Sequence, residues 1–390
     1  MKNGLHVLIA AAFALGGCSL GGDDNGGDKP PRPRGPVVAV VLDSNGERRA
    51  TLQADGAVEQ AAPDGEGGWY VSGQFRNIDG YDRGYLAHVD ADGNVDPDWK
   101  PRLDRAETTV TVSARIAVGN GRVYLAGDFG SANGAPRDGA AAVDAQTGKL
   151  DPAWAPKVGN VSDAIAFADG RVIVATGTVV EAYDAADGQP YRAFRLRAGP
   201  DDIEDAGVYT LVPSGSQLYI GGRFRRVNGV ARTGIARVDV RTGRLDSGWK
   251  PPLLTTAGCP ECHGPVTDIA VTPTAVYLLG DFARLGRSRT PGGLAALDPS
   301  SARLSSTFQP PIAGRSADGY GGFYEAMALL GQRLLVGGDF GGAPTRSFVA
   351  LDLTSGNQVP SWHPRRRGAL VKRVVPSGEN ALVAGTKLGD

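Results

Sequence analysis

A repeat of about fifty residues fills the chain from Val37 onward. Each copy reads as a strand, a turn, a second strand ending in G-D-F or a relative, a loop, a third strand ending in Asp, a T-G turn and a segment ending in W-x-P. The clearest copies run from Val123 to Pro156 and from Leu218 to Pro251. A glycine of the second strand recurs at intervals of 45 to 58 residues, at Gly73, Gly127, Gly177, Gly222, Gly280, Gly338 and Gly385.

The two ends of the chain each supply half of a copy. Leu370 to Val375 and Ala381 to Thr386 match the first and second strands, whereas Val37 to Leu42 and Arg48 to Gln53 match the third and fourth. Together with six complete copies, they predict an all-β fold. It is a seven-bladed β-propeller of four-stranded antiparallel blades over residues 37–390, with the last blade closed by the N- and C-terminal strands. Eight blades remain the alternative if the two ends belong to separate units.

Composition and charge narrow the class of protein further. The chain has 57 Gly and 26 Pro among 390 residues, which favours many turns and short strands. Forty-one Lys plus Arg against 42 Asp plus Glu leave a formal charge of −1. Because no basic field surrounds such a chain, the sequence argues against a nucleic-acid partner.

The first 36 residues predict export and a lipid anchor. Leu5 to Leu15 is an apolar run behind Lys2, too short to span a bilayer, and it predicts a signal peptide over residues 1–17. Leu15-Gly16-Gly17-Cys18 resembles the bacterial lipobox, which implies cleavage before Cys18 and its acylation, with palmitate as a typical chain. An ordinary signal peptide cleaved nearby is the alternative. Residues 18–36 read as a Gly/Pro-rich tether. The predicted location is the cell envelope, on the outer membrane or cell surface rather than the inner membrane.

Aromatic residues recur in step with the repeat. Trp99, Trp154, Trp249, Phe308 and Trp362 end the fourth strands and are predicted to pack between neighbouring blades. The glycines of the T-G and related turns are expected where a positive φ is required.

These motifs carry a family resemblance. G-D-F-x-x-x-N-G-x-x-R, A-x-V-D-x-x-T-G-x-L-D and W-x-P resemble the delta-60 repeat family of bacterial exported propellers over Val37 to Asp390. More distantly, the A-x-D-x-x-T-G-x-x-x-W core resembles the tryptophan-docking repeat of quinoprotein-type propellers. Lipoprotein subunits of outer-membrane assembly machinery share that repeat. The delta-60 resemblance implies an exported propeller without a settled activity.

Cys259-Pro-Glu-Cys262-His263 interrupts the repeat. Its C-x-x-C-H spelling is that of c-type haem attachment, with Cys259 and Cys262 as thioethers and His263 as axial ligand. The simpler interpretation is a disulfide between Cys259 and Cys262 in an oxidising compartment, and the sequence favours it. Zinc ranks below both because only three nearby ligands can be named, so a metal stays unassigned.

Two segments between the repeats gather acids and aromatics on one predicted loop face. These residues are Asp201, Asp202, Glu204, Asp205, Asp318, Tyr320 and Tyr324. They could bind a cation, a sugar or a basic peptide, although charged loops often serve only solubility.

Catalytic signatures are scarce, since His88, His263 and His363 fall in different copies without a nucleophile elbow or an H-E-x-x-H motif. The sequence therefore favours a lipid-anchored, non-catalytic binding scaffold without a cofactor. The membrane would be contacted through the lipid, and a protein or glycan through the loop face. One alternative is a quinoprotein-like or c-haem-bearing redox protein with quinone or haem as cofactor. Another is a subunit of an outer-membrane assembly complex.

Overall fold

A computed structural model gives the structure of the chain. It describes residues 35–105, 111–159, 163–199, 206–256, 264–290, 293–311, 324–338, 348–362 and 370–388. The chain divides into two compact units, Met1–Pro31 and Arg32–Asp390, and all described residues belong to the second. They form thirty-three β-strands, as expected for an all-β protein. Within these ranges, no helix has the length and apolar character needed to cross a membrane.

Six groups of three strands share one plan, in which the strands pair antiparallel with the second strand in the middle; five are separate sheets, and the third belongs to a longer, six-stranded sheet. The Gly/Pro-punctuated runs of Val, Ile, Leu and Ala in each copy account for these short strands. In chain order the sheets are β3 (Val58–Pro63), β4 (Trp69–Gly73) and β7 (Leu86–Val89); β9 (Ser113–Gly119), β10 (Arg122–Asp128) and β13 (Ala140–Asp144); β14 (Ala164–Ala168), β15 (Arg171–Thr176) and β16 (Val179–Asp184); β18 (Gly207–Ser214), β19 (Gln217–Arg223) and β22 (Ile235–Asp239); β24 (Val266–Val271), β25 (Val276–Gly280) and β28 (Leu294–Leu297); and β29 (Tyr324–Leu330), β30 (Arg333–Gly338) and β31 (Phe348–Asp352).

A seventh sheet joins the two ends of the described chain. Its strands follow the order β2-β1-β33-β32, with bounds Arg48–Gln53, Val37–Leu42, Asn380–Thr386 and Leu370–Ser377. The N-terminal β1 pairs antiparallel with the C-terminal β33, from Ala39 opposite Ala384 to Leu42 opposite Ala381. The pairing of N-terminal with C-terminal strands in one four-stranded sheet is therefore present.

Short strands connect the larger sheets. Four hairpins have two-residue turns, which are Asn-Gly in two copies, Asp79-Gly80 in one and Gly286-Arg287 in another, and three of them pair with a strand that arrives from the preceding sheet. The hairpins and their partners are β5 (Asn77–Ile78) with β6 (Tyr81–Asp82); β11 (Ser131–Ala132) and β12 (Ala135–Pro136) with β8 (Leu103–Asp104); β20 (Arg226–Val227) and β21 (Val230–Ala231) with β17 (Leu196–Gly199); and β26 (Arg284–Leu285) and β27 (Ser288–Arg289) with β23 (Leu254–Thr255).

The expected fourth strand is the main departure from the sequence-based fold. In the six consecutive sheets one isolated bridge stands in its place beside the third strand, such as Val89 with Val95 and Val143 with Leu150, although in the third sheet β16 also pairs with β17. In three of the six copies an Asp follows the bridge, and its side chain accepts hydrogen bonds from the next backbone amides. Oδ1 of Asp96 accepts hydrogen bonds from the amides of Asp98 and Trp99, at 2.9 and 3.3 Å. A turn held by a side chain thus replaces the ladder.

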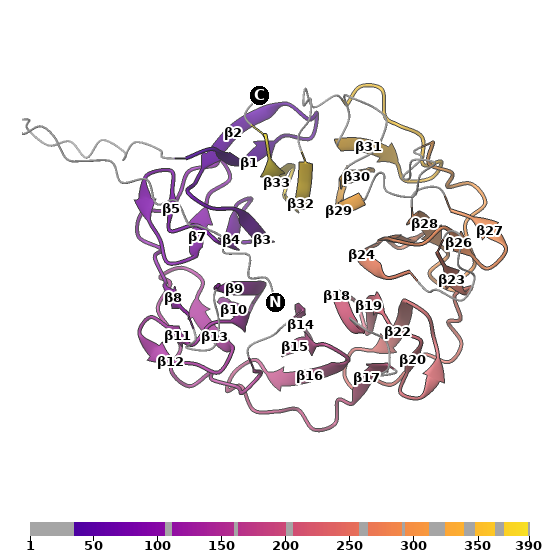
Figure 1. The fold of residues 1–390 in the computed structure, drawn as a ribbon, viewed down its shortest axis with the longest axis horizontal. Coiled ribbons are helices and arrows are strands. Elements are labelled where there is room, and N and C mark those ends of the chain that lie inside the picture. Colours follow the sequence, from indigo (N-terminus) through magenta and orange to yellow (C-terminus); the bar gives the residue numbers. More distant parts are fainter. Residues whose placement is uncertain are drawn as a thin grey trace, which may run out of the picture. The chain divides into compact units, whose positions relative to one another are not determined.

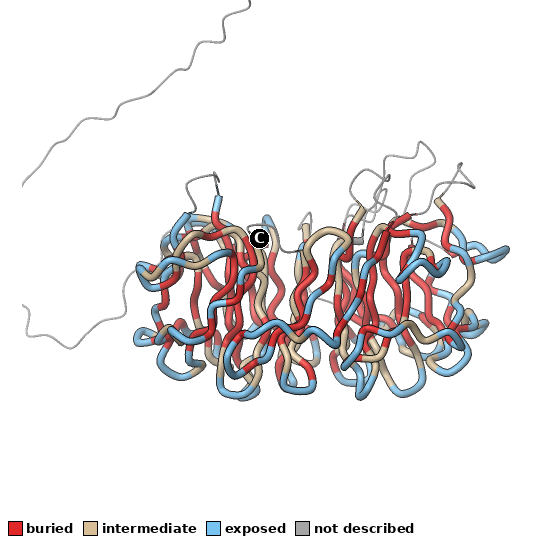
Figure 2. The backbone as a smooth tube through the Cα atoms, turned by 90° about the horizontal axis from the view of Figure 1, so that it is seen from below, coloured by how far each residue is buried: buried red, intermediate tan, exposed pale blue. Residues whose placement is uncertain are grey.

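The first strands of the seven sheets lie innermost in the second unit (Figure 1). They contact one another in the order β32, β3, β9, β14, β18, β24 and β29, and β29 contacts β32 in turn. This arrangement is propeller-like. Figure 2 shows that buried residues follow the strands, whereas exposed residues gather at the turns.

The core consists of apolar layers between neighbouring sheets. Trp154 is fully buried among residues of two sheets, including Ala140 of β13 and Val174 of β15. Trp99, Trp249, Phe308 and Trp362 occupy the same place at other boundaries. The prediction that these aromatics pack between neighbouring sheets is therefore confirmed.

Candidate functional site

The asparagines of the clearest N-G loops serve the backbone. Oδ1 of Asn133 accepts a 2.8 Å hydrogen bond from the amide of Arg102, and its Nδ2 donates to the carbonyl oxygen of Gly148 at 3.1 Å. Asn228 makes the same pair of contacts with Arg197 and Gly243. Each asparagine therefore joins the segment arriving from the preceding sheet to the T-G turn of its own copy.

The arginine of the N-G-x-x-R motif also serves the fold. Both Nη groups of Arg137 donate to backbone carbonyls, at 2.9 Å to Pro136 and 3.2 Å to Asp151. Arg232 repeats this arrangement with Ala231 and Asp246. Both arginines thus bind backbone carbonyls of their own copy.

The aspartate that ends the third strand caps the T-G turn. Oδ1 of Asp144 accepts hydrogen bonds from the amide and the hydroxyl of Thr147, both at 2.7 Å. These bonds are the main reason why the pKa of Asp144 lies below its usual value. Gly148 follows at φ 66°, the positive value expected of the turn glycine. The polar residues that define the repeat are thus already used by the fold.

Almost all site residues expected from the sequence lie outside the described ranges. This holds for the lipidation residue Cys18, for Cys259, Cys262 and His263, and for the loop residues Asp201, Asp202, Glu204, Asp205, Asp318 and Tyr320. Tyr324 begins β29, but its side chain is outside the described part as well. The lipid, disulfide, haem and loop-face hypotheses therefore stay predictions.

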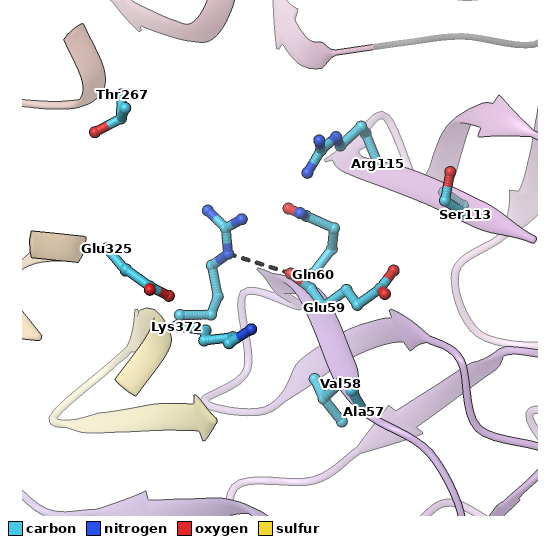
Figure 3. A pocket seen from close by; sticks show the side chains of 11 residues that line it. Ala57, Val58, Glu59, Gln60, Ser113, Arg115, Thr267, Glu325 and Lys372 are labelled. Atoms are coloured by element: carbon cyan, nitrogen blue, oxygen red, sulfur yellow. Dashed lines mark hydrogen bonds between the residues drawn. The ribbon is translucent and has the colours of Figure 1, made fainter. Parts of the chain in front are cut away.

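A cavity of about 630 Å³ lies between the first strands of five sheets, β3, β9, β24, β29 and β32. Its charged and amide-bearing lining residues are Glu59, Gln60, Arg115, Glu325, Lys372 and Arg373. Figure 3 shows Glu325, Lys372, Gln60 and Arg115 extending from different strands into the same space. The innermost strands thus supply a polar site at the centre of the sheets.

β-Bulges position several of these side chains. The pairing of first with second strand skips one residue in four of the lining strands, namely Glu59 in β3, Thr267 in β24, Glu325 in β29 and Lys372 in β32. Each of the four lines the cavity. A bulge adds an unpaired residue and turns its side chain away from the regular alternation. The bulges therefore bring polar side chains into a space that strict alternation would line differently.

Two arginines dominate the positive side of the cavity. Nε of Arg373 donates a 3.2 Å hydrogen bond to the backbone carbonyl oxygen of Glu59. Arg115 is half-buried, and its guanidinium has no hydrogen-bond or ion-pair partner within the part of the chain that the structure describes. Burial is the largest cause that lowers the pKa of Arg115, and the positive charge of Arg373 lowers it further.

Three carboxylates at or near the cavity accept hydrogen bonds from other groups. Oε2 of Glu59 accepts from Nε2 of Gln74 at 3.3 Å, and Oδ2 of Asp163 accepts from the amide of Gly177 at 2.7 Å. Asp268 accepts from the amides of Ile269 and Met327, at 2.9 and 3.0 Å. Burial raises the pKa of Asp268 to about 6, although Arg373 and these two amides oppose the rise.

A second polar cluster surrounds His88 in β7. Its Nε2 lies 3.0 Å from Oδ2 of Asp64, and its Nδ1 lies 3.1 Å from Oδ2 of Asp96. The ring stacks on Tyr70 at a centroid distance of 4.7 Å. In another copy, Arg237 holds Asp246 in a comparable way at 2.6 Å. His88 is therefore best explained as the side chain that holds the turn aspartate of its copy.

The search for sites in the sequence missed the central cavity. A signal was present, because apolar first strands carry polar residues near their start, as in V-E-Q at 58–60, A-R-I at 114–116 and V-K-R at 371–373. These residues break the alternation expected of a half-buried strand. Within the described ranges, no group of three or more His, Cys, Asp or Glu is placed to hold a metal ion.

Comparisons with known proteins found similarity in structure but not in sequence. No family model matches the chain. No curated protein matches it either. The computationally designed Ika8 protein has a TM-score of 0.49 and 15% identity, over 93% of this chain and 98% of that one. The WD40 β-propeller domain of Doa1 has a TM-score of 0.49 and 13% identity, over 89% and 97%. Hydrazine synthase from Kuenenia stuttgartiensis has a TM-score of 0.46 and 16% identity, over 76% of each chain. The delta-60 resemblance therefore stays a prediction from the motifs.

Proposed function

We propose that this chain is a closed seven-bladed β-propeller that acts as a non-catalytic binding scaffold, held at the cell envelope by a lipid on Cys18. The observation that carries the binding role is the central cavity, into which charged side chains from several sheets extend. The polar residues of the repeat support the non-catalytic part of the proposal, because they already bind backbone groups of the fold.

The closed ring is supported by the contacts of the first strands and by the pairing of β1 with β33. Deleting Leu370 to Asp390 removes β32 and β33 and leaves β1 paired with β2 alone. We expect this deletion to lower the melting temperature and to broaden the unfolding transition, because the neighbouring sheets lose a packed face. Deleting Ser19 to Arg34, the tether, is the control that should leave melting unchanged. An unchanged melting temperature after the C-terminal deletion would argue for an open array.

The lipid anchor is supported by the sequence Leu15-Gly16-Gly17-Cys18. Cells fed a labelled palmitate analogue should incorporate the label into the full-length protein and not into Cys18→Ala. The variant should also move from the membrane fraction to the soluble fraction, because it lacks the acyl chains. Equal labelling of both proteins, or an unlabelled wild-type protein, would remove the lipid anchor from the proposal.

The binding role is tested by capturing partners from envelope extracts and on a glycan array. We compare the wild-type protein with a variant whose loop acids Asp201, Asp202, Glu204 and Asp205 are replaced by the corresponding amides. The scaffold proposal expects a specific protein or glycan that the variant retains less well. A visible absorption spectrum separates the redox alternative. A Soret band lost in Cys259→Ala would replace the scaffold with an electron-transfer protein.

A further inference from the structure

We propose that the central cavity binds a small organic molecule through an oxyanion, a carboxylate or a phosphate, held between Arg115 of β9 and Arg373 of β32. The inference rests on the proposed binding role of the protein. It depends neither on the lipid anchor nor on a partner at the loops.

Arg115 differs from four other arginines that are largely buried. Arg122 forms a 2.7 Å ion pair with Asp151, and Arg237 forms a 2.6 Å ion pair with Asp246. Arg137 and Arg232 donate to backbone carbonyls. Arg115 alone of these five has no such acceptor in the described part of the chain. A guanidinium has five N–H donors, and leaving them unpaired in a half-buried site is costly.

Arg373 presents a second guanidinium to the same space. Its Nε is used by the carbonyl oxygen of Glu59, which fixes the side chain, while its two Nη groups have no acceptor within the described residues. Arg115 and Arg373 line one cavity, and their charges repel each other. An oxyanion between the two would satisfy the free donors and relieve this repulsion, since guanidinium groups bind carboxylate and phosphate by paired hydrogen bonds.

Glu59 and Asp163 do not occupy the guanidinium donors that an oxyanion would use. Glu59 and Asp163 attract Arg115 electrostatically, but each accepts a hydrogen bond from another group, Gln74 and the amide of Gly177 respectively. Neither forms an ion pair with Arg115 or Arg373 within the described ranges. The acids thus offset part of the positive charge without occupying the donors.

The rest of the cavity indicates an organic molecule rather than a bare ion. A volume of about 630 Å³ lies within the range of small-molecule sites and greatly exceeds one phosphate. Gln60, Thr267 and Glu325 add hydrogen-bonding groups around the arginines. Such a lining suits a hydroxylated anion, for example an acidic sugar, whose hydroxyls would meet these side chains.

The test compares glucuronate with glucose, because glucuronate has a carboxylate where glucose has a hydroxymethyl group. Inorganic phosphate serves as a bare oxyanion. Isothermal titration at constant ionic strength should show saturable binding of glucuronate by the full-length protein and none of glucose. Weak phosphate binding lost in Arg115→Gln would assign the site to the oxyanion itself, whereas phosphate binding unaffected by that variant would contradict the arginine pair.

Variants decide whether the two arginines hold the anion. Arg115→Gln and Arg373→Gln should each weaken glucuronate binding about tenfold or more, since each loses a charge-assisted hydrogen bond. Arg289→Gln, which changes an exposed arginine on the hairpin strand β27, should bind as the wild type does. Circular dichroism checks that each variant is folded. If Arg373→Gln unfolds, Arg373→Lys takes its place, because it keeps the positive charge and loses the paired donors of the guanidinium. Equal binding by wild type and Arg115→Gln, or no binding by the wild type, would overturn the proposal. Lipid labelling and partner capture would then stand unaffected.

Discussion

Nε1 of Trp154 donates a 3.0 Å hydrogen bond to the backbone carbonyl oxygen of Asp184, which ends β16 in the next sheet. Trp99 makes the same contact with Asp144 one copy earlier, at 3.3 Å. Trp249 occupies the corresponding boundary, yet its buried Nε1 has no partner within the described residues. Packing is therefore common to the repeated tryptophans, and the hydrogen bond between sheets is an addition in some copies.

This difference allows a matched comparison of Trp154→Phe with Trp249→Phe. Both substitutions shrink a fully buried ring, but only the first removes a hydrogen bond, since the carbonyl oxygen of Asp184 then keeps only its bond from the amide of Gly188. We expect Trp154→Phe to lower the free energy of unfolding by about 1–2 kcal/mol more than Trp249→Phe does. Denaturant titration followed by circular dichroism measures both. Equal losses would mean that the bond between the sheets adds nothing to stability.

The marker glycine of the repeat permits a close approach of two strands. A Cβ on Gly222 would lie 2.0 Å from the carbonyl oxygen of Gly207, so β18 and β19 would have to separate. We expect Gly222→Ala to cost about 2 kcal/mol or more, as other severe steric conflicts do. Gly248→Ala is the control, since its Cβ would meet only Oδ1 of Asp246 at 3.4 Å and the equivalent residue of another copy is Ala153. Thermal melting compares the two, and similar losses would show that the close approach is not required.

The strands at the chain ends could be predicted because their signals are local. The sequence places strands at Val37 to Leu42 and Arg48 to Gln53, and the structure has strands with the same bounds. An uninterrupted apolar run at Val37 to Leu42 and an Asn45-Gly46 turn suffice for this prediction. The T-G turn glycines and the aromatic layers follow from the repeat in the same way.

Other features depend on contacts that no local pattern reveals. Asp96 and Trp99 look like part of a fourth strand, but the side chain of Asp96 binds the following amides and ends the ladder. Predicting the cavity requires the pairing register of the first and second strands, because that register places Glu59 and Lys372 in β-bulges. It also needs sheets far apart in sequence to meet, as Arg115 and Arg373 do. The polar residues were visible in the sequence, but their convergence was not.

The two carboxylates that contact His88 should make the stability of the fold depend on pH. Burial raises the pKa of Asp64 and of Asp96, but hydrogen bonds from His88 and from backbone amides outweigh it, so both pKa values lie below the usual range. A lowered carboxyl pKa stabilises the fold above the unfolded value of about 4. That stability is lost as the pH falls through the folded value. We therefore expect an acid-induced loss of stability below about pH 4.

His88→Ala tests this expectation, because it removes the partner of both carboxylates. At neutral pH we expect a loss of about 2 kcal/mol, the scale of hydrogen bonds to charged groups. The difference from wild type should shrink as the pH falls below about 4. Asp92→Asn, which alters an exposed acid in the nearby turn, is the control. Unfolding free energies measured across this range decide the matter, and a difference that does not change with pH would contradict the role of the carboxylates.

Asp268 should change the pH dependence of stability in the opposite direction from Asp64 and Asp96. Its carboxyl has a pKa of about 6 in the folded protein, mainly through burial, against 3.8 for the ordinary side chain. Between these values the folded chain binds a proton that the unfolded chain has released. Stability therefore falls as the pH rises from about 4 to about 6. After a discount for partial access of solvent, the fall should amount to about 2 kcal/mol.

Asp268→Asn removes this titration while it keeps the size of the side chain. The amide can still accept from one of the two backbone N–H groups of Ile269 and Met327, so we expect a constant loss from the other bond and a flatter profile. Relative to wild type, the variant should be weakest near pH 4 and gain about 2 kcal/mol by about pH 7. Denaturant titrations at both pH values measure this gain. If the two profiles run parallel, the carboxyl of Asp268 titrates at its ordinary pKa, and the centre of the sheets is wetter than its burial implies.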